Sequence, residues 1–173
     1  MVAAGQTSYD TIDSGVTILA PSTAPQGSTF QTQLTADPIE VPTTGGGYPV
    51  KQLKNVDVRF DLPAGATFVG ATLSGGSQLG AGTPSVSLVG NQIVLHIPGN
   101  LSPGTTAVLP TVTATLQATG TVGTVLQAKM SGSSFADPSI TFQAVVTVFF
   151  FDVTADASCY APVNPVLAET TIT

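Results

Sequence analysis

Apolar and polar residues alternate one by one along much of the chain. In residues 56–62 the apolar side chains fall on the even positions, and Asp57, Arg59 and Asp61 fall between them. Residues 111–119 repeat the pattern, with threonines and a glutamine separating the apolar positions. Such alternation puts successive side chains on opposite faces of a strand, one buried and one in solvent. No stretch shows uninterrupted helical spacing, so the sequence predicts antiparallel strands.

Gly- and Pro-rich turns separate these alternating runs at short intervals. Gly90-Asn91 is typical of a two-residue hairpin turn, because both residues can adopt positive φ. Long loops are expected at residues 37–48 and 74–84. We expect strands near residues 15–19, 28–35, 52–62, 67–73, 85–89, 92–97, 106–119, 124–131 and 140–153, and a short one at 166–172. This spacing predicts an all-β, immunoglobulin-like antiparallel β-sandwich of about 9–10 strands.

Composition narrows the class of protein. With 173 residues, 42% hydrophobic and only 8% charged, the chain is expected to fold as a single domain over residues 1–173 rather than to be disordered. Residues 1–14 and 155–173 are left open as extended arms. A net charge of -6 with four basic residues argues against binding to nucleic acid. No apolar run approaches the roughly 20 residues of a transmembrane helix, so no transmembrane segment is expected.

The first five residues lack the basic start and apolar core of a signal peptide. Two explanations stay open. Either a signal peptide has been removed from an exported protein, or the protein is made without one, as a phage structural protein is. The many neutral hydroxyl side chains and the scarcity of lysine favour the first explanation, and therefore an extracellular or cell-envelope location.

Several segments resemble known bacterial proteins. The run LPAGATFV at 62–69, followed by Ser-Gly-Gly at 74–76, resembles the conserved repeat domain of bacterial surface proteins, an immunoglobulin-like sandwich. The order of segments 25–30, 62–69, 82–90, 98–120 and 158–167 resembles a set of secreted proteins from mycobacteria and related actinobacteria. This resemblance covers most of the chain. It implies an exported envelope or extracellular protein, and it carries no assigned catalytic residue or ligand.

Candidate catalytic groups are few. His96 is the only histidine, and no G-x-S-x-G turn supplies a nucleophile for it. Asp57 and Asp61 flank Arg59 on one face of a strand at spacings of about 7 Å. Paired carboxylates can hydrolyse a glycan or bind an anionic or sugar ligand. The arginine between them favours a solvated, salt-bridged row, so we expect no catalytic residue and no enzyme activity.

Metal and cofactor sites are not predicted. One cysteine and one histidine cannot form a zinc site alone, and no calcium-loop motif is present. Asp152 with Asp156, or Asp37 with Glu40, leaves an irregular calcium site as an open alternative. We expect no cofactor.

The segment 145–153 breaks the alternation. As one strand, it puts Val146, Val148 and Phe150 on one face and a second apolar row on the other. A sandwich strand has one inner face, so this second row needs a cover. A loop or the C-terminal tail could supply it, or the row could form an interface or an apolar ligand groove. The candidate residues are Val145, Phe149, Phe151 and Val153, together with Cys159 and Tyr160.

Cys159 has no partner for an intrachain disulfide. In an oxidising compartment a lone cysteine is either buried or paired with a cysteine of another chain. The sequence leaves both possibilities open.

These features predict a non-enzymatic, exported structural or interaction module of the cell envelope, acting through strand edges and the aromatic strand. Open strand edges favour self-assembly into oligomers or filaments. The expected partners are further copies of the chain or another envelope protein. Two alternatives stay open: a carrier of an apolar envelope lipid, held in a groove between the sheets, and a phage virion decoration or tail protein.

Overall fold

The computed structural model describes residues 15–173, and strands are the only regular secondary structure in that part of the chain. Every strand pairing is antiparallel except that of β15 with β2. The strands are β1 (Val16–Leu19), β2 (Thr23–Ala24), β3 (Thr29–Ala36), β4 (Ile39–Glu40), β5 (Thr44–Gly45), β6 (Tyr48–Asp61), β7 (Ala66–Ser74), β8 (Ser85–Val89), β9 (Gln92–Ile97), β10 (Thr106–Ala107), β11 (Thr111–Ala118), β12 (Val125–Ala128), β13 (Ile140–Val148), β14 (Phe151–Cys159) and β15 (Ala168–Ile172).

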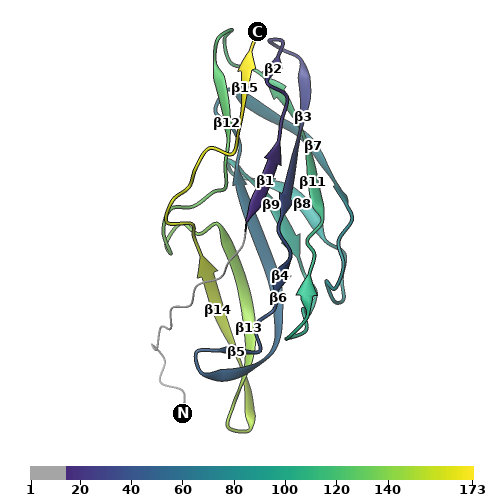
Figure 1. The fold of residues 1–173 in the computed structure, drawn as a ribbon, viewed down its shortest axis with the longest axis vertical. Coiled ribbons are helices and arrows are strands. Elements are labelled where there is room, and N and C mark those ends of the chain that lie inside the picture. Colours follow the sequence, from purple (N-terminus) through teal and green to yellow (C-terminus); the bar gives the residue numbers. More distant parts are fainter. Residues whose placement is uncertain (1–14) are drawn as a thin grey trace.

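Two sheets enclose the main core of an elongated molecule (Figure 1). One has the order β1-β3-β11-β7, and the other has the order β14-β13-β6-β9-β8, with β5 paired to β6. Alternate residues of both sheets meet in the core, including Leu34, Val112, Leu116, Val58, Phe60, Leu95 and Ile97. The prediction of an all-β antiparallel sandwich is therefore confirmed.

The long strand β6 departs from simple alternation. Val50, Leu53 and Val56 are all buried although they are three residues apart. The register between β6 and β13 shifts twice along this stretch, and Asn55 has a φ of 52° at one of the shifts. An extra residue at each bulge restores the inward direction of the next apolar side chain.

The upper end of the molecule is closed by a small sheet in the order β12-β15-β2 (Figure 1). Its own core includes Ala118, Leu126 and Ile172, and Ile172 is fully buried. Of residues 155–173, which the sequence leaves open as an arm, 155–159 belong to β14 and 168–172 to β15. Residues 1–14, the other candidate arm, lie outside the described residues.

The remaining boundaries differ from expectation in small ways. The run expected at 106–119 is divided into β10 and β11, because Pro110 has no N–H for a continuous ladder. The loop expected at 37–48 contains the short strands β4 and β5, whereas none forms between Ser74 and Ser85. Gly90, with a φ of 60°, makes the expected hairpin turn between β8 and β9.

The prediction of one strand over 140–153 is wrong. The chain reverses at Phe149-Phe150, so that β13 and β14 form a hairpin with Val148 opposite Phe151. This hairpin reaches the lower end of the molecule, opposite the C-terminus (Figure 1). The turn contains no Gly, Pro, Asn or Asp, and the sequence therefore gives no ordinary signal for it.

Candidate functional site

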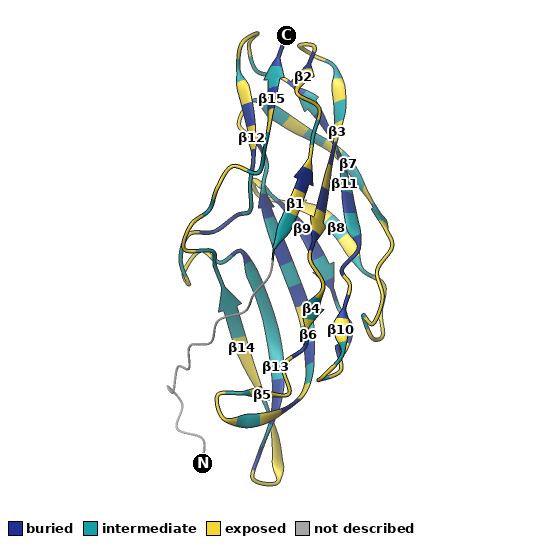
Figure 2. Ribbon diagram, viewed as in Figure 1, coloured by how far each residue is buried: buried dark blue, intermediate teal, exposed yellow. Residues whose placement is uncertain are grey.

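Three consecutive phenylalanines form the tip of the β13–β14 hairpin. Phe149 is 81% exposed, Phe150 is 94% exposed and Phe151 is 75% exposed. Figure 2 shows the turn as an exposed end of the molecule. Large apolar side chains in such an exposed group indicate an interaction site. We call Phe149, Phe150 and Phe151 the aromatic tip.

The backbone of the aromatic tip is also unusual. Phe149 has a φ of 55°, in the left-handed region. A two-residue hairpin turn needs positive φ at its first central position, which glycine, asparagine or aspartate ordinarily supplies. For another L-residue the left-handed conformation costs roughly 1–2 kcal/mol. The chain thus carries a phenylalanine where folding alone favours glycine.

Thr147 and Asp152, which pair across the hairpin one step behind Val148 and Phe151, are polar. Lys51 Nζ donates a hydrogen bond to Asp152 Oδ2 at 2.8 Å, and Thr147 Oγ1 donates to Asp152 Oδ1 at 3.2 Å. The hydrogen bond from the Lys51 ammonium is the main reason that the pKa of Asp152 lies below its ordinary value. The apolar tip therefore adjoins a polar base formed by Lys51, Thr147 and Asp152. The Lys51 ammonium, the cation nearest the tip, is paired with the Asp152 carboxylate.

The structure separates the residues expected to form one apolar row. Val153 lies opposite Val146 in register and packs against the main core. Val145 is only 8% exposed, between Gln52 and Thr154 in the neighbouring strands. The expectation of a shared outer face is wrong for Val145 and Val153, because the chain turns back after Val148 and no continuous row exists.

Phe149 and Phe151 do lie together, and Phe150 joins them. The sequence pattern places Phe150 on the opposite face from the candidate residues, yet it is the most exposed large hydrophobic residue among those described. The available signal was the run of aromatic residues between Thr147 and Asp152, which suits a turn as well as a strand.

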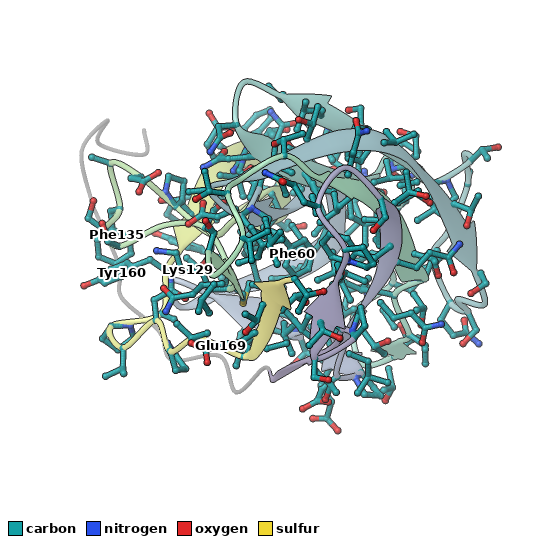
Figure 3. The ribbon with its side chains drawn as sticks, turned by 90° about the horizontal axis from the view of Figure 1, so that it is seen from above. Phe60, Lys129, Phe135, Tyr160 and Glu169 are labelled. Atoms are coloured by element: carbon teal, nitrogen blue, oxygen red, sulfur yellow. The ribbon has the colours of Figure 1, made fainter. Side chains whose placement is uncertain are left out.

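Cys159 and Tyr160 lie at the other end of β14. Cys159 comes eight positions after Phe151, which corresponds to about 26 Å along a strand. Cys159 is half-buried, and burial raises the pKa of its thiol. The Tyr160 ring packs edge to face against Phe135, with 4.8 Å between centroids (Figure 3). These two residues are thus not part of the aromatic tip.

An open groove of about 530 Å³ lies beside this far end of the hairpin. Phe135 lines it, and Asn55, Gln143 and Asp156 form a polar row along it. Asn55 Nδ2 donates to Gln143 Oε1 at 3.0 Å, and Gln143 Nε2 donates to Asp156 Oδ1 at 3.0 Å. These side chains therefore hydrogen-bond to one another across β6, β13 and β14, at the bulge marked by Asn55.

The acidic row of β6 is held by ion pairs with Arg59 and Lys129 and by hydrogen bonds. Asp57 binds both Arg59 Nη2 at 3.2 Å and His96 Nδ1 at 2.6 Å. Asp61 Oδ1 accepts a hydrogen bond from Ser131, and its other oxygen lies 3.4 Å from Lys129 Nζ. Asp57 is thus bound from its own strand and from β9, and Asp61 is bound from the segment that follows β12.

No group of three or more potential metal ligands occurs within residues 15–173. Asp152 and Asp156 are four residues apart on one strand, which is about 13 Å. That separation is too large for both carboxylates to bind one calcium ion, at ligand distances near 2.3–2.6 Å. Each is also hydrogen-bonded to a neighbouring side chain.

Two further observations bear on lipid. A void between the two main sheets, lined by residues such as Ile18, Phe60 and Leu116, has a volume of about 10 Å³. This is about one water molecule, far less than a lipid chain needs. In the described residues, no helix is long and apolar enough to cross a membrane.

Comparisons with known proteins support the fold. No protein-family model and no curated protein matches the chain. A crystal structure of a "putative membrane anchored protein" from Corynebacterium diphtheriae is similar, with a TM-score of 0.58 and 18% identity over 91% of this chain. The match takes in 32% of that protein, so the present chain spans about a third of its length. At this identity the similarity shows a shared all-β fold alone.

Proposed function

We propose that this protein is a non-enzymatic interaction module of the cell envelope that docks through the aromatic tip. The observation that carries the proposal is the exposure of Phe149, Phe150 and Phe151 at a turn that needs positive φ at its first position. Departures from local folding preference tend to occur at functional sites. Here the sequence departs from it twice, in backbone strain and in exposed apolar surface.

The burial free energy available from the three exposed phenylalanines supports a docking role. Full burial of a phenylalanine is worth about 1.5–3 kcal/mol. The three largely exposed rings therefore hold about 3.8–7.5 kcal/mol of unused burial energy, after scaling by exposures of 81%, 94% and 75%. Association consumes part of this through lost motional freedom, so the tip alone suits a weak or multivalent contact.

The envelope setting rests on separate support. The structural neighbour from Corynebacterium diphtheriae is named for membrane anchoring. The sequence resembles secreted actinobacterial proteins, and its polar residues are mainly neutral hydroxyls. The alternative is a phage virion protein, and the identity of the genes that flank this one would distinguish the two settings. The lipid-carrier alternative receives no support from the small void between the sheets.

The test compares association of the native chain and a tip variant with isolated actinobacterial cell envelopes. Phe149→Ser, Phe150→Ser and Phe151→Ser are combined in the variant, and cosedimentation is measured. We expect at least about a tenfold loss of binding, from the burial energy of even one ring. Val122→Ser is a control, because Val122 is 65% exposed in the turn between β11 and β12, outside the β13–β14 hairpin. Equal cosedimentation of all three proteins would refute the proposed docking role.

A further inference from the structure

We propose that the aromatic tip inserts into the interfacial layer of an uncharged or zwitterionic lipid bilayer. This inference rests on the proposed docking role and names its partner. It assigns a lipid surface to Phe149, Phe150 and Phe151, with the β13–β14 hairpin as the inserting element.

The shape of the tip favours a fluid partner. The three exposed fractions, 81%, 94% and 75%, leave little of any ring covered by another ring or by the body of the protein. Three separately exposed rings on a two-residue turn do not provide the flat patch with a polar rim that protein interfaces usually have. A protein partner would need a shaped pocket for each ring, whereas lipid chains rearrange around them.

The backbone at the tip also suits a lipid surface. Backbone N–H and C=O groups need hydrogen-bond partners wherever water is scarce. The β13–β14 ladder continues without a gap from Ile140 opposite Cys159 to Val148 opposite Phe151. Only the two-residue turn lies beyond it. The outer edge of β14 has no pairing strand, because β14 is the edge strand of its sheet, and this limits insertion to the polar interfacial layer.

The polar base limits the depth of insertion. Asp152 follows Phe151 directly, and Lys51 and Thr147 bind its carboxylate. One strand residue spans about 3.3 Å, so charge begins one step behind the rings. This geometry suits shallow insertion, of the order of the 5–10 Å typical of interfacial segments.

The net negative charge of the protein favours uncharged or zwitterionic lipid over anionic lipid. The chain has ten acidic and four basic residues, and the cation nearest the tip, Lys51, is paired with Asp152. An anionic surface would repel the protein as a whole and meet no free basic cluster at the tip. Binding should therefore depend on apolar insertion and respond little to salt.

The experiment uses flotation of the protein with dioleoylphosphatidylcholine vesicles. We expect the native protein to float and Phe150→Ser to reduce the partition coefficient about tenfold or more. Val163→Ser is the matched control, because Val163 is 76% exposed but lies outside the hairpin. Circular dichroism confirms that both variants are folded. Vesicles with an equal share of phosphatidylglycerol should bind no better.

A fluorescence measurement provides a second readout. The chain has no tryptophan, so Phe150→Trp introduces a single reporter at the tip. Its emission should shift to the blue when phosphatidylcholine vesicles are added and should be quenched by brominated lipid chains. The same variant without vesicles gives the reference spectrum.

The possible outcomes separate the two proposals. Absence of flotation and of a blue shift would overturn the bilayer inference, as would equal losses in Phe150→Ser and Val163→Ser. Salt-sensitive binding to anionic vesicles alone would also overturn it. If sedimentation without lipid then showed tip-dependent self-association, or envelope binding stayed tip-dependent, the docking role would stand with a protein partner. If no assay responded to the tip, both proposals would fail.

Discussion

Backbone strain at Phe149 gives a sharp test of the turn geometry, by comparing Phe149→Gly with Phe150→Gly. Phe149 has a φ of 55°, whereas Phe150 is not among the described residues with positive φ. Glycine adopts positive φ without a steric penalty, so only the first substitution relieves strain. Both substitutions add similar flexibility to the unfolded chain, and that contribution cancels in the comparison.

The structure sets the magnitude of the difference. Relief of the left-handed conformation at position 149 is worth about 1–2 kcal/mol. Phe149 is 81% exposed and Phe150 is 94% exposed, so each loses little packing, about 0.3–0.6 and 0.1–0.2 kcal/mol respectively. Phe149→Gly should therefore be more stable than Phe150→Gly by about 1 kcal/mol.

Urea unfolding monitored by circular dichroism measures this difference. With an m-value of about 2 kcal/mol/M, the midpoint of Phe149→Gly should lie about 0.5 M above that of Phe150→Gly. Both variants should lose association with the docking partner, because each removes an exposed ring. Equal midpoints, or a lower midpoint for Phe149→Gly, would refute the argument that the turn is strained at this position. If Phe149→Gly were more stable than the native chain but bound the docking partner less well, the strain at position 149 would serve binding and not folding.

Three further outcomes test other parts of the structure. Lys51→Met should raise the pKa of Asp152 toward its ordinary value, seen by NMR titration. Because the native pKa is depressed, the pair stabilises the folded state above the ordinary pKa, and this contribution disappears as the pH falls through the lowered value. Cys159 should react with iodoacetamide more slowly in the folded than in the urea-unfolded chain at mildly alkaline pH, because burial raises its thiol pKa. Ile172→Ala should destabilise the fold by about 2–5 kcal/mol in urea unfolding, because Ile172 is fully buried; a negligible effect would mean that β15 is dispensable.

Much of the sandwich could be predicted because burial has the period of the strand. Residues 111–118 alternate between half-buried threonines or glutamine and fully buried apolar residues. The turn at Gly90 could be predicted because glycine readily adopts the positive φ that this turn requires. The bulges in β6 were less visible, because they change the spacing of buried residues from two to three and depend on the register with β13.

The candidate site was only partly predictable, for a related reason. Residues 145–153 contain more apolar side chains than one inner face of a strand can bury, so the sequence predicts exposed apolar surface there. It does not predict where the chain reverses. Phe149-Phe150 is a turn built from residues that rarely form one, so local propensity predicts a strand. The placement of Phe150 with its neighbours, and of Val145 and Val153 away from them, depends on the reversal.

The sequence by itself determined the all-β class and the shortage of charge, because these follow from composition and from alternation between neighbours. Only the tertiary structure decided where the surplus of apolar surface lies. Long-range pairing of β13 with β6, together with the β13–β14 hairpin, buries Val146 and Val148. It leaves Phe149 and Phe150 beyond the last ladder pair, in which Phe151 lies opposite Val148. Strand pairing outweighs the local preference of Phe149 for an extended backbone. A short window of sequence cannot predict this outcome, because it does not contain the strand β6 that pairs with β13.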